Sequence, residues 1–231
     1  MTEELFIEIG TEEIPARFLD TAQAALGEGT VKLLGNVAHG AVRTFATPRR
    51  LAVSVQNVAA TRPSAEKLIT GPAAAIAFKD GQLTPAGEAF ARKNGVPTGA
   101  VFAQPGPKGD VAAIRKVEGG EATLDLLAAG LEALVMGLPF KKTMRWRSGN
   151  YKFARPIHYI CARLGGRLIE ARVAGLVTTV QSRGHGLHAP QPFAFKDSLD
   201  WLTTLRQHFV LADPGERRGE LLLQLRRAAE D

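Results

Sequence analysis

The chain has 231 residues, which is long enough to bury a core without disulfides or structural metals. Of these residues, 45% are hydrophobic and 23% charged, an ordinary composition for a globular protein. No apolar run approaches the roughly 20 residues that span a bilayer, the acidic start argues against a signal peptide, and the single cysteine, Cys161, excludes an intrachain disulfide. A cytoplasmic location is the expected default.

The formal net charge is +6, and the positive charge is concentrated in one part of the chain. Between positions 141 and 183, ten lysines and arginines accompany a single acid, Glu170. Such a stretch attracts polyanions and releases their counterions. The alternative is a solvated basic face that has no partner.

The first predicted elements are a strand and a helix. Residues 5–9 alternate between core-type and acidic side chains, which predicts a strand. Thr11 is suited to cap a helix that has Pro15 in its first turn. Gly27 and Gly29 interrupt the apolar spacing and leave the end of this helix open.

The next stretch predicts a pair of strands and a short helix. Residues 41–46 and 50–58 read as paired strands, the second with one buried face. Residues 61–72 read as a loop. Residues 84–94 form a predicted helix that Thr84 caps and Gly95 ends.

The remaining pattern mixes hairpins with helices. Gly165-Gly166 is a strong signal for a hairpin turn. Strands are predicted at 110–117, 159–164, 168–173 and 176–180, and helices at 124–135, 198–209 and 216–229. The prediction is an α+β fold with a largely antiparallel mixed sheet and packed helices. Residues 1–210 would form one region, and 211–231 the start of a following helical domain with an unmatched leucine stripe.

Two stretches combine basic residues with aromatic ones. Residues 140–147 and 151–159 interleave lysines and arginines with Phe, Trp and Tyr, a mixture that suits RNA through phosphate contacts and ring stacking. The alternative is that the rings anchor the core while the charges face water. Arg49 and Arg50 sit at a strand connection, where guanidinium groups bind phosphate well, or where they pair with Glu12 or Glu13.

Other chemical motifs are weak. There is no Walker A motif and no dinucleotide glycine fingerprint. His185 and His188 are too few for a zinc site, and no metal site is predicted. His158 and Cys161 would point to opposite faces of one strand, so Cys161 reads as structural and no catalytic residue is assigned.

Several of these stretches together carry a family resemblance. They are Phe6-Ile7-Glu8-Ile9-Gly10-Thr11-Glu12-Glu13-Ile14-Pro15, Thr47-Pro48-Arg49-Arg50-Leu51-Ala52, Gly71-Pro72 with Phe90-Ala91-Arg92-Lys93, Leu138 to Trp146, Phe153 to His158, and Gly184-His185. In this order they resemble the β subunit of the bacterial heterotetrameric glycyl-tRNA synthetase. The chain departs from the family pattern at Gly186, where an arginine is usual, and in the glycine content of residues 24–34.

The resemblance implies an amino-terminal fragment of a longer subunit, which in the family continues into an HD-type helical domain and an anticodon-binding domain. The family ligates glycine to tRNA(Gly) with ATP, and the α subunit holds the ATP, with Mg, and forms the adenylate. The β subunit binds and positions tRNA within a heterotetramer. This piece is therefore expected to need no cofactor and to be inactive alone. Its later part is similar to the B3/B4-type fold of phenylalanyl-tRNA synthetase.

The resulting hypothesis assigns tRNA contacts to nine residues. Arg49, Arg50, Lys141, Lys142, Arg145, Arg147 and Arg155 would contact phosphates, and Trp146 and Tyr151 would stack on bases. Two other roles stay open: an assembly scaffold for α or a second β chain, and an editing hydrolase, which fold analogy alone suggests.

Overall fold

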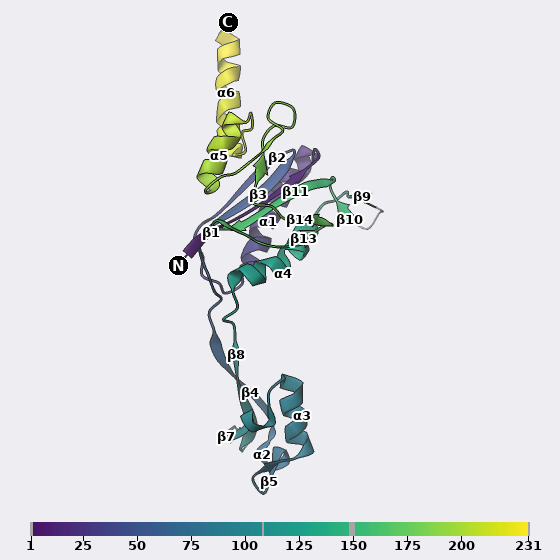
Figure 1. The fold of residues 1–231 in the computed structure, drawn as a ribbon, viewed down its shortest axis with the longest axis vertical. Helices are drawn as coiled ribbons and strands as arrows, with labels where there is room; N and C mark the ends of the chain where they lie inside the picture. Colours follow the sequence, from purple (N-terminus) through teal and green to yellow (C-terminus); the bar gives the residue numbers. More distant parts are fainter. Residues whose placement is uncertain (1, 108, 148–150, 231) are drawn as a thin grey trace. The chain divides into compact units, whose positions relative to one another are not determined.

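A computed structural model describes residues 2–107, 109–147 and 151–230, which form two compact units (Figure 1). Unit 1 contains residues 1–62 and 121–231, and unit 2 contains residues 63–120. The last helix is grouped with unit 1, and the expected start of a following helical domain at residue 211 stays a prediction. The α+β class is confirmed, because helices pack against antiparallel sheets.

Unit 1 is built on a five-stranded antiparallel sheet in the order β12-β11-β1-β3-β2. The strands are β1 (Thr2–Thr11), β2 (Val42–Thr47), β3 (Arg50–Ala59), β11 (Ile157–Leu164) and β12 (Arg167–Leu168). The central strand β1 places Glu8 opposite Ala52 of β3 and Cys161 of β11. The predicted hairpin is confirmed, with Gly165 at a φ of 57° between β11 and β12.

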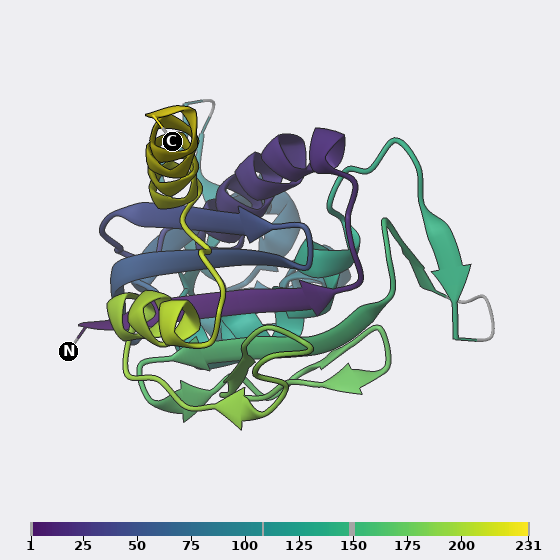
Figure 2. The same cartoon turned by 90° about the horizontal axis from the view of Figure 1, so that it is seen from above.

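Helices cover both faces of this sheet. Alternate residues of β1, namely Leu5, Ile7 and Ile9, point into the larger core with α1 (Leu19–Leu34) and α4 (Thr123–Met136). The residues between them point to a second core under α5 (Ser198–Gln207), where Phe6 packs on Trp201. In Figures 1 and 2, α5 and the pair α1 and α4 lie on opposite sides of the sheet. The prediction of a single buried face for β3 is therefore wrong.

The chain around the sheet carries short hairpins and a terminal helix. The hairpins pair β9 (Met144–Trp146) with β10 (Tyr151–Phe153), β13 (Arg172–Val173) with β14 (Leu176–Val177), and β15 (Ser182–Arg183) with β16 (Pro192–Phe193). The last helix, α6 (Pro214–Glu230), has no buried residue, and Leu221, Leu222, Leu223 and Leu225 are exposed. The predicted leucine stripe is thus uncovered within the described chain.

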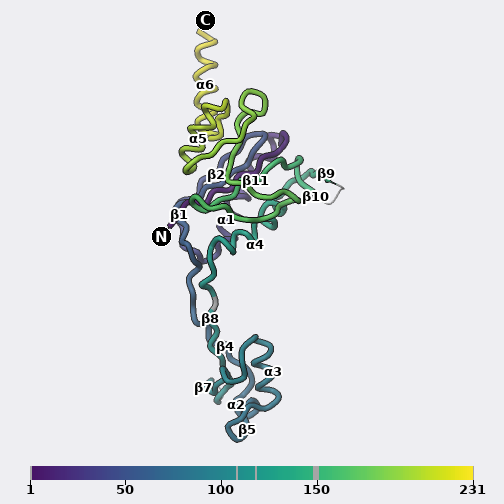
Figure 3. The backbone as a smooth tube through the Cα atoms, viewed as in Figure 1, coloured from purple at the N-terminus to yellow at the C-terminus, as the bar shows by residue number. Residues whose placement is uncertain are grey.

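Unit 2 is inserted in the sequence between β3 and α4, as the chain trace shows (Figure 3). Its sheet has the order β4-β8-β7, formed by β4 (Ala65–Ala73), β8 (Val111–Glu118) and β7 (Phe102–Gln104). The other elements are α2 (Ala74–Ala77), β5 (Phe78–Lys79), β6 (Gln82–Leu83), α3 (Pro85–Asn94) and the 3-10 turn η2 (Thr98–Ala100). A small core of alanines, valine and isoleucine, including Ile114, holds it together.

In unit 1, the backbone is hydrogen-bonded where unit 2 is inserted. The Arg62 amide donates to the Glu121 carbonyl at 3.0 Å, and Thr61 pairs with Ala122 in an antiparallel bridge. The two ends of the insertion therefore leave unit 1 as neighbours.

Several local predictions need correction. Thr11 ends β1 and caps no helix; the 3-10 turn η1 (Ala16–Phe18) comes first, and α1 then runs through Gly27 and Gly29. The predicted loop at 61–72 contains most of β4, because pairing with β8 overrides its turn residues. The helix α3 is confirmed, since Thr84 accepts a hydrogen bond from the Gly87 amide and Gly95 is left-handed.

Candidate functional site

The basic residues at the start of the positive segment lie on and before the β9–β10 hairpin. Lys141 and Lys142 precede β9 and are exposed, as are Arg145 on β9, Arg147 after it and Lys152 on β10. We call these five residues the basic hairpin. Figures 1 and 2 show the hairpin extending past the ends of the strands of the five-stranded sheet. The turn at 148–150 lies outside the described residues.

Aromatic residues attach the basic hairpin to the core. Phe153 is buried and contacts Phe140 edge-on, with 4.7 Å between ring centroids. Trp146 and Tyr151 are partly buried against the same core, and their centroids are 6.0 Å apart. The core-anchoring interpretation accounts for these contacts, while base stacking by Trp146 and Tyr151 stays a prediction. Arg155 is half-buried and donates to its neighbour's carbonyl, Ala154, at 2.8 Å.

Arg49 and Arg50 have different surroundings despite being adjacent. Arg49 is exposed and pairs with Glu13 at 3.2 Å, one of the two pairings expected. Arg50 is 4% exposed and donates to the Glu8 carboxylate at 2.9 Å and to the Gly184 carbonyl at 3.4 Å. Its burial speaks against direct contact with a tRNA phosphate, and Arg50 instead holds two strands and a loop together.

The carboxylate of Glu8 is the centre of a buried polar network. Besides Arg50, it accepts hydrogen bonds from the Tyr159 hydroxyl at 2.8 Å and from Trp201 Nε1 at 3.2 Å. Trp201 Nε1 also lies 3.0 Å from Ser182 Oγ. Burial and the neighbouring Glu8 charge raise the pKa of Tyr159 well above its ordinary value. The network joins β1, β3, β11 and α5 across the second core.

Arg50 and Tyr159 of this network also line a cavity of about 460 Å³, which we call the arginine cavity. Five segments line it: the end of β1, the β2–β3 turn, the start of β11, the end of β15 with the loop after it, and the chain from the end of α5 into α6. The lining residues that carry charge are Arg49, Arg50, Arg183, Arg217 and Glu13. The Thr11 amide donates to the Arg49 carbonyl at 2.9 Å, and the His185 amide to the His208 carbonyl at 3.0 Å, so the walls are tied to the frame.

Two further arginines of the positive segment are bound by the protein itself. Arg163 is buried and donates to the carbonyls of Gly165, Phe195 and Lys196. Arg167 on β12 pairs with Glu3 at 2.5 Å. The positive charge that the sequence concentrates is therefore divided among the basic hairpin, arginines with structural contacts, the arginine cavity, and Arg172, which is exposed on β13.

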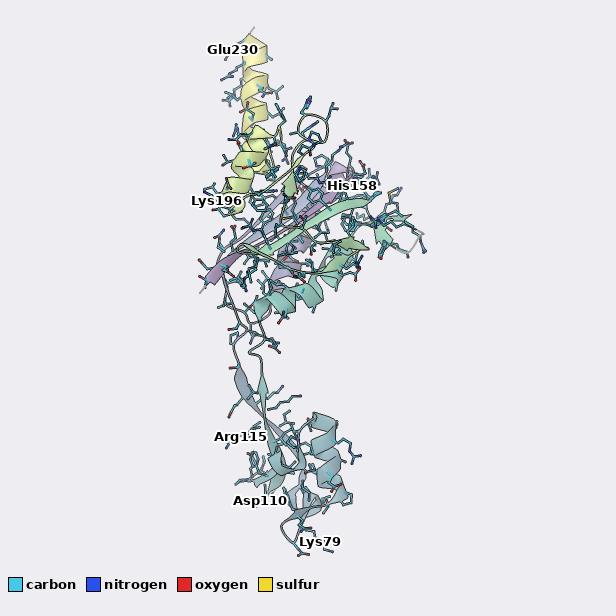
Figure 4. The ribbon with its side chains drawn as sticks, viewed as in Figure 1. Lys79, Asp110, Arg115, His158, Lys196 and Glu230 are labelled. Carbon is cyan, nitrogen blue, oxygen red and sulfur yellow. The ribbon has the colours of Figure 1, made fainter. Side chains whose placement is uncertain are left out.

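The histidines and the cysteine have local roles. His158, labelled in Figure 4 near the start of β11, is exposed and pairs with Glu12 at 2.8 Å. Nδ1 of His185 accepts hydrogen bonds from the amides of Leu187 and His188. Cys161 is buried on the same strand as His158, as expected, and burial raises the pKa of its thiol. Among the described residues, no three His, Cys, Asp or Glu side chains gather as a metal site would require.

Four residues of this site have no functional role in the sequence-based hypothesis. The sequence places Glu8 in a strand pattern and a family motif, and it gives Arg183 and Arg217 no role. Phe209 is expected at a helix end, yet it stands just beyond α5 with a φ of 62° and is 66% exposed on the cavity. The sequence shows that Arg183 and Arg217 are positively charged, but their charge does not predict which other segments of the chain lie next to them.

Comparison with known proteins identifies the family. The family model described as "Glycyl-tRNA synthetase beta subunit" matches residues 5–231. The chain belongs to the glycyl-tRNA synthetase β-subunit family. It is 43% identical to the glycine–tRNA ligase β subunit of Geobacter sulfurreducens and 42% identical to that of Geotalea daltonii, over its full length. It is also 42% identical, over 99% of its length, to the β subunit of Anaeromyxobacter dehalogenans strain 2CP-C.

The match to these relatives covers only part of their length. The chain spans 34% of the Geobacter and Geotalea subunits and 33% of the Anaeromyxobacter one. Among the described helices, none combines the length and apolar character that crossing a membrane requires.

Proposed function

We propose that this chain is the part of a glycine–tRNA ligase that binds and positions tRNA(Gly). In this proposal, glycine is joined to tRNA with ATP at a site on the α subunit, α and β form a heterotetramer, and this piece carries no catalytic residue. Membership of the β-subunit family supports the assignment of this chain to a glycine–tRNA ligase. The observation that carries the tRNA role is the basic hairpin, where exposed cations stand on a firmly packed support.

Charge and rigidity are the two properties that phosphate contact requires. Lys141, Lys142 and Lys152 form no ion pair with any carboxylate in the described ranges, so their charge is available to a polyanion. Phe153 fixes the hairpin to the core, so bound phosphates would meet a preformed surface. Such contacts position an RNA and carry no base specificity by themselves.

One further observation favours a second role, in assembly. The four leucines exposed on α6, Leu221, Leu222, Leu223 and Leu225, form an apolar surface of the kind that protein partners cover. Assembly with an α subunit or another β chain is compatible with tRNA binding by the hairpin, since α6 and the hairpin are separate elements.

The test is a filter-binding titration of tRNA(Gly) at several salt concentrations. The charge-reversed variant Lys141→Glu/Lys142→Glu should bind more weakly and have a salt slope shallower by about two, one for each lost phosphate contact. The matched control, Lys32→Glu/Lys196→Glu, makes the same change in net charge at exposed positions on α1 and before α5. Equal weakening by both variants would show a general charge effect and refute the hairpin assignment.

The scaffold alternative gives a different result. No measurable tRNA binding by the wild-type chain, together with tight association with the α subunit in a pull-down, would replace the tRNA role with assembly alone.

A further inference from the structure

We propose that the arginine cavity binds a single nucleotide, with the phosphate on its arginines and the base beside Phe209. This inference goes beyond the tRNA-binding role, because it concerns a different part of unit 1 from the basic hairpin and a ligand of defined size. The two can therefore fail separately.

The charge of the cavity favours an anion. Arg49 and Arg50 are already paired with Glu13 and Glu8. Arg183 and Arg217 also line the cavity and form no ion pair with any carboxylate that the structure describes. Arg183 lies over the Tyr159 ring, 5.5 Å from its centroid, and Arg217 donates to the Leu211 carbonyl at 2.7 Å. Guanidinium groups with unused donors at the edge of a cavity suit a phosphate.

The other part of the wall is apolar and includes an exposed ring. Pro48, Pro190, Val210 and Leu211 line the cavity together with Phe209. Phe209 occupies the left-handed position after α5, where helices usually place glycine. Such a conformation is unfavourable for a bulky residue, and strained residues of this kind cluster at functional sites. It leaves the Phe209 ring on the cavity rim, where a flat base can stack.

The size of the cavity separates a nucleotide from a simple anion. At about 460 Å³ it falls within the range of small-molecule sites, roughly 300–1,000 Å³, and has room beyond one phosphate. A phosphate joined to a flat heteroaromatic ring matches the arginines and the apolar wall together. A free nucleotide and one unpaired nucleotide of an RNA strand both present this chemistry.

The first test is isothermal titration calorimetry of the whole chain with AMP, inorganic phosphate and adenosine as separate probes. The expected result is that AMP binds more tightly than either fragment. Phosphate binding as tightly as AMP would overturn the proposal, because the base would then contribute nothing.

Two variants and a control locate the ligand. Arg183→Gln should weaken AMP binding about tenfold, as expected for loss of one charge-assisted hydrogen bond. Arg217→Gln should weaken it as well, because Arg217 is the other lining arginine without a carboxylate partner among the described residues. Arg172→Gln, at an exposed arginine on β13 outside the cavity, should leave it unchanged. Equal effects of Arg183→Gln and Arg172→Gln would overturn the proposal, and circular dichroism verifies that each variant is folded.

The source of the nucleotide is distinguished with a single-stranded RNA trinucleotide. If AMP binds and competes with the trinucleotide, the site accepts a nucleotide in either form. If only the trinucleotide binds, and Arg183→Gln abolishes it, the ligand is a nucleotide within RNA. If neither binds, the proposal is wrong, whatever the basic hairpin does. Lys141→Glu/Lys142→Glu should leave AMP binding unchanged even where it weakens tRNA binding.

Discussion

Replacing Glu8 with glutamine tests whether the buried network stabilises unit 1. The Glu8 carboxylate is 0% exposed and faces Arg50 at 2.9 Å, so Glu8→Gln keeps the size of the side chain but leaves the guanidinium buried without a counter-charge. Removing one partner of a buried ion pair costs about 3–5 kcal/mol. Because glutamine still offers a carbonyl oxygen to Tyr159 and Trp201, we expect a loss near the lower end, about 3 kcal/mol.

The assay is urea denaturation followed by tryptophan fluorescence at neutral pH. Both tryptophans, Trp146 and Trp201, belong to unit 1, so the signal reports on that unit and not on residues 63–120. The matched control is Glu3→Gln, which breaks the more exposed pair with Arg167 and should cost at most about 1 kcal/mol.

A second variant separates the charge effect from general disruption. In Glu8→Gln/Arg50→Met both charges of this pair are removed, so part of the lost stability should return relative to Glu8→Gln alone. The reasoning is refuted if Glu8→Gln costs under about 1 kcal/mol, or if it costs no more than Glu3→Gln.

Two predictions concern titration and reactivity. Burial and Glu8 raise the pKa of Tyr159 above its usual value of about 10, so the unfolded chain loses the phenolic proton at a lower pH than the folded chain does. The free energy of unfolding should therefore fall as the pH rises past about 10. Urea titrations at successive pH values should show a smaller fall for Tyr159→Phe. Burial likewise raises the pKa of the Cys161 thiol, so Ellman's reagent should not react with the native chain near about pH 8 but should react in concentrated urea; fast reaction with the native chain would contradict the burial.

Local signals in the sequence were sufficient where a segment's own residues determine its structure. The helix α3 has its capping threonine, an early proline and a terminal glycine within the element, and its bounds follow from them. The strand β1 and the pair β2–β3 could likewise be predicted as strands, although both faces of β1 and β3 are buried. Gly165 marks a hairpin because a two-residue turn needs a left-handed residue.

Features that depend on distant segments could not be predicted. Glu8 is buried because α5 covers the second sheet face, and Trp201 of that helix lies 193 positions further along the chain. An acidic residue between apolar ones suggests a solvent-facing position, and only the covering helix reverses that expectation. The strand β4 contains Gly71 and Pro72, so its residues suggest a loop, and its pairing with β8 decides otherwise.

The candidate site divides in the same way. The basic hairpin follows from consecutive residues, so its charged positions could be named, although the two short strands could not. The arginine cavity joins residues from five segments, and the sequence alone does not show that Arg183 and Arg217 line the same cavity as Thr11. The sequence also does not distinguish Arg49 from Arg50. The two arginines are adjacent, but Arg49 is exposed and Arg50 is buried.

The backbone hydrogen bond between Arg62 and Glu121 has a consequence for which segments can replace residues 63–120. Because the chain departs for residues 63–120 and returns at the same point, unit 1 keeps every strand neighbour whatever the intervening segment contains. Lengthening, shortening or exchanging that segment is topologically neutral for the five-stranded sheet. Residues 63–120 are thus a module that natural variation or an engineer can replace with a tight turn, while the sheet, its two cores and the cavity stay continuous.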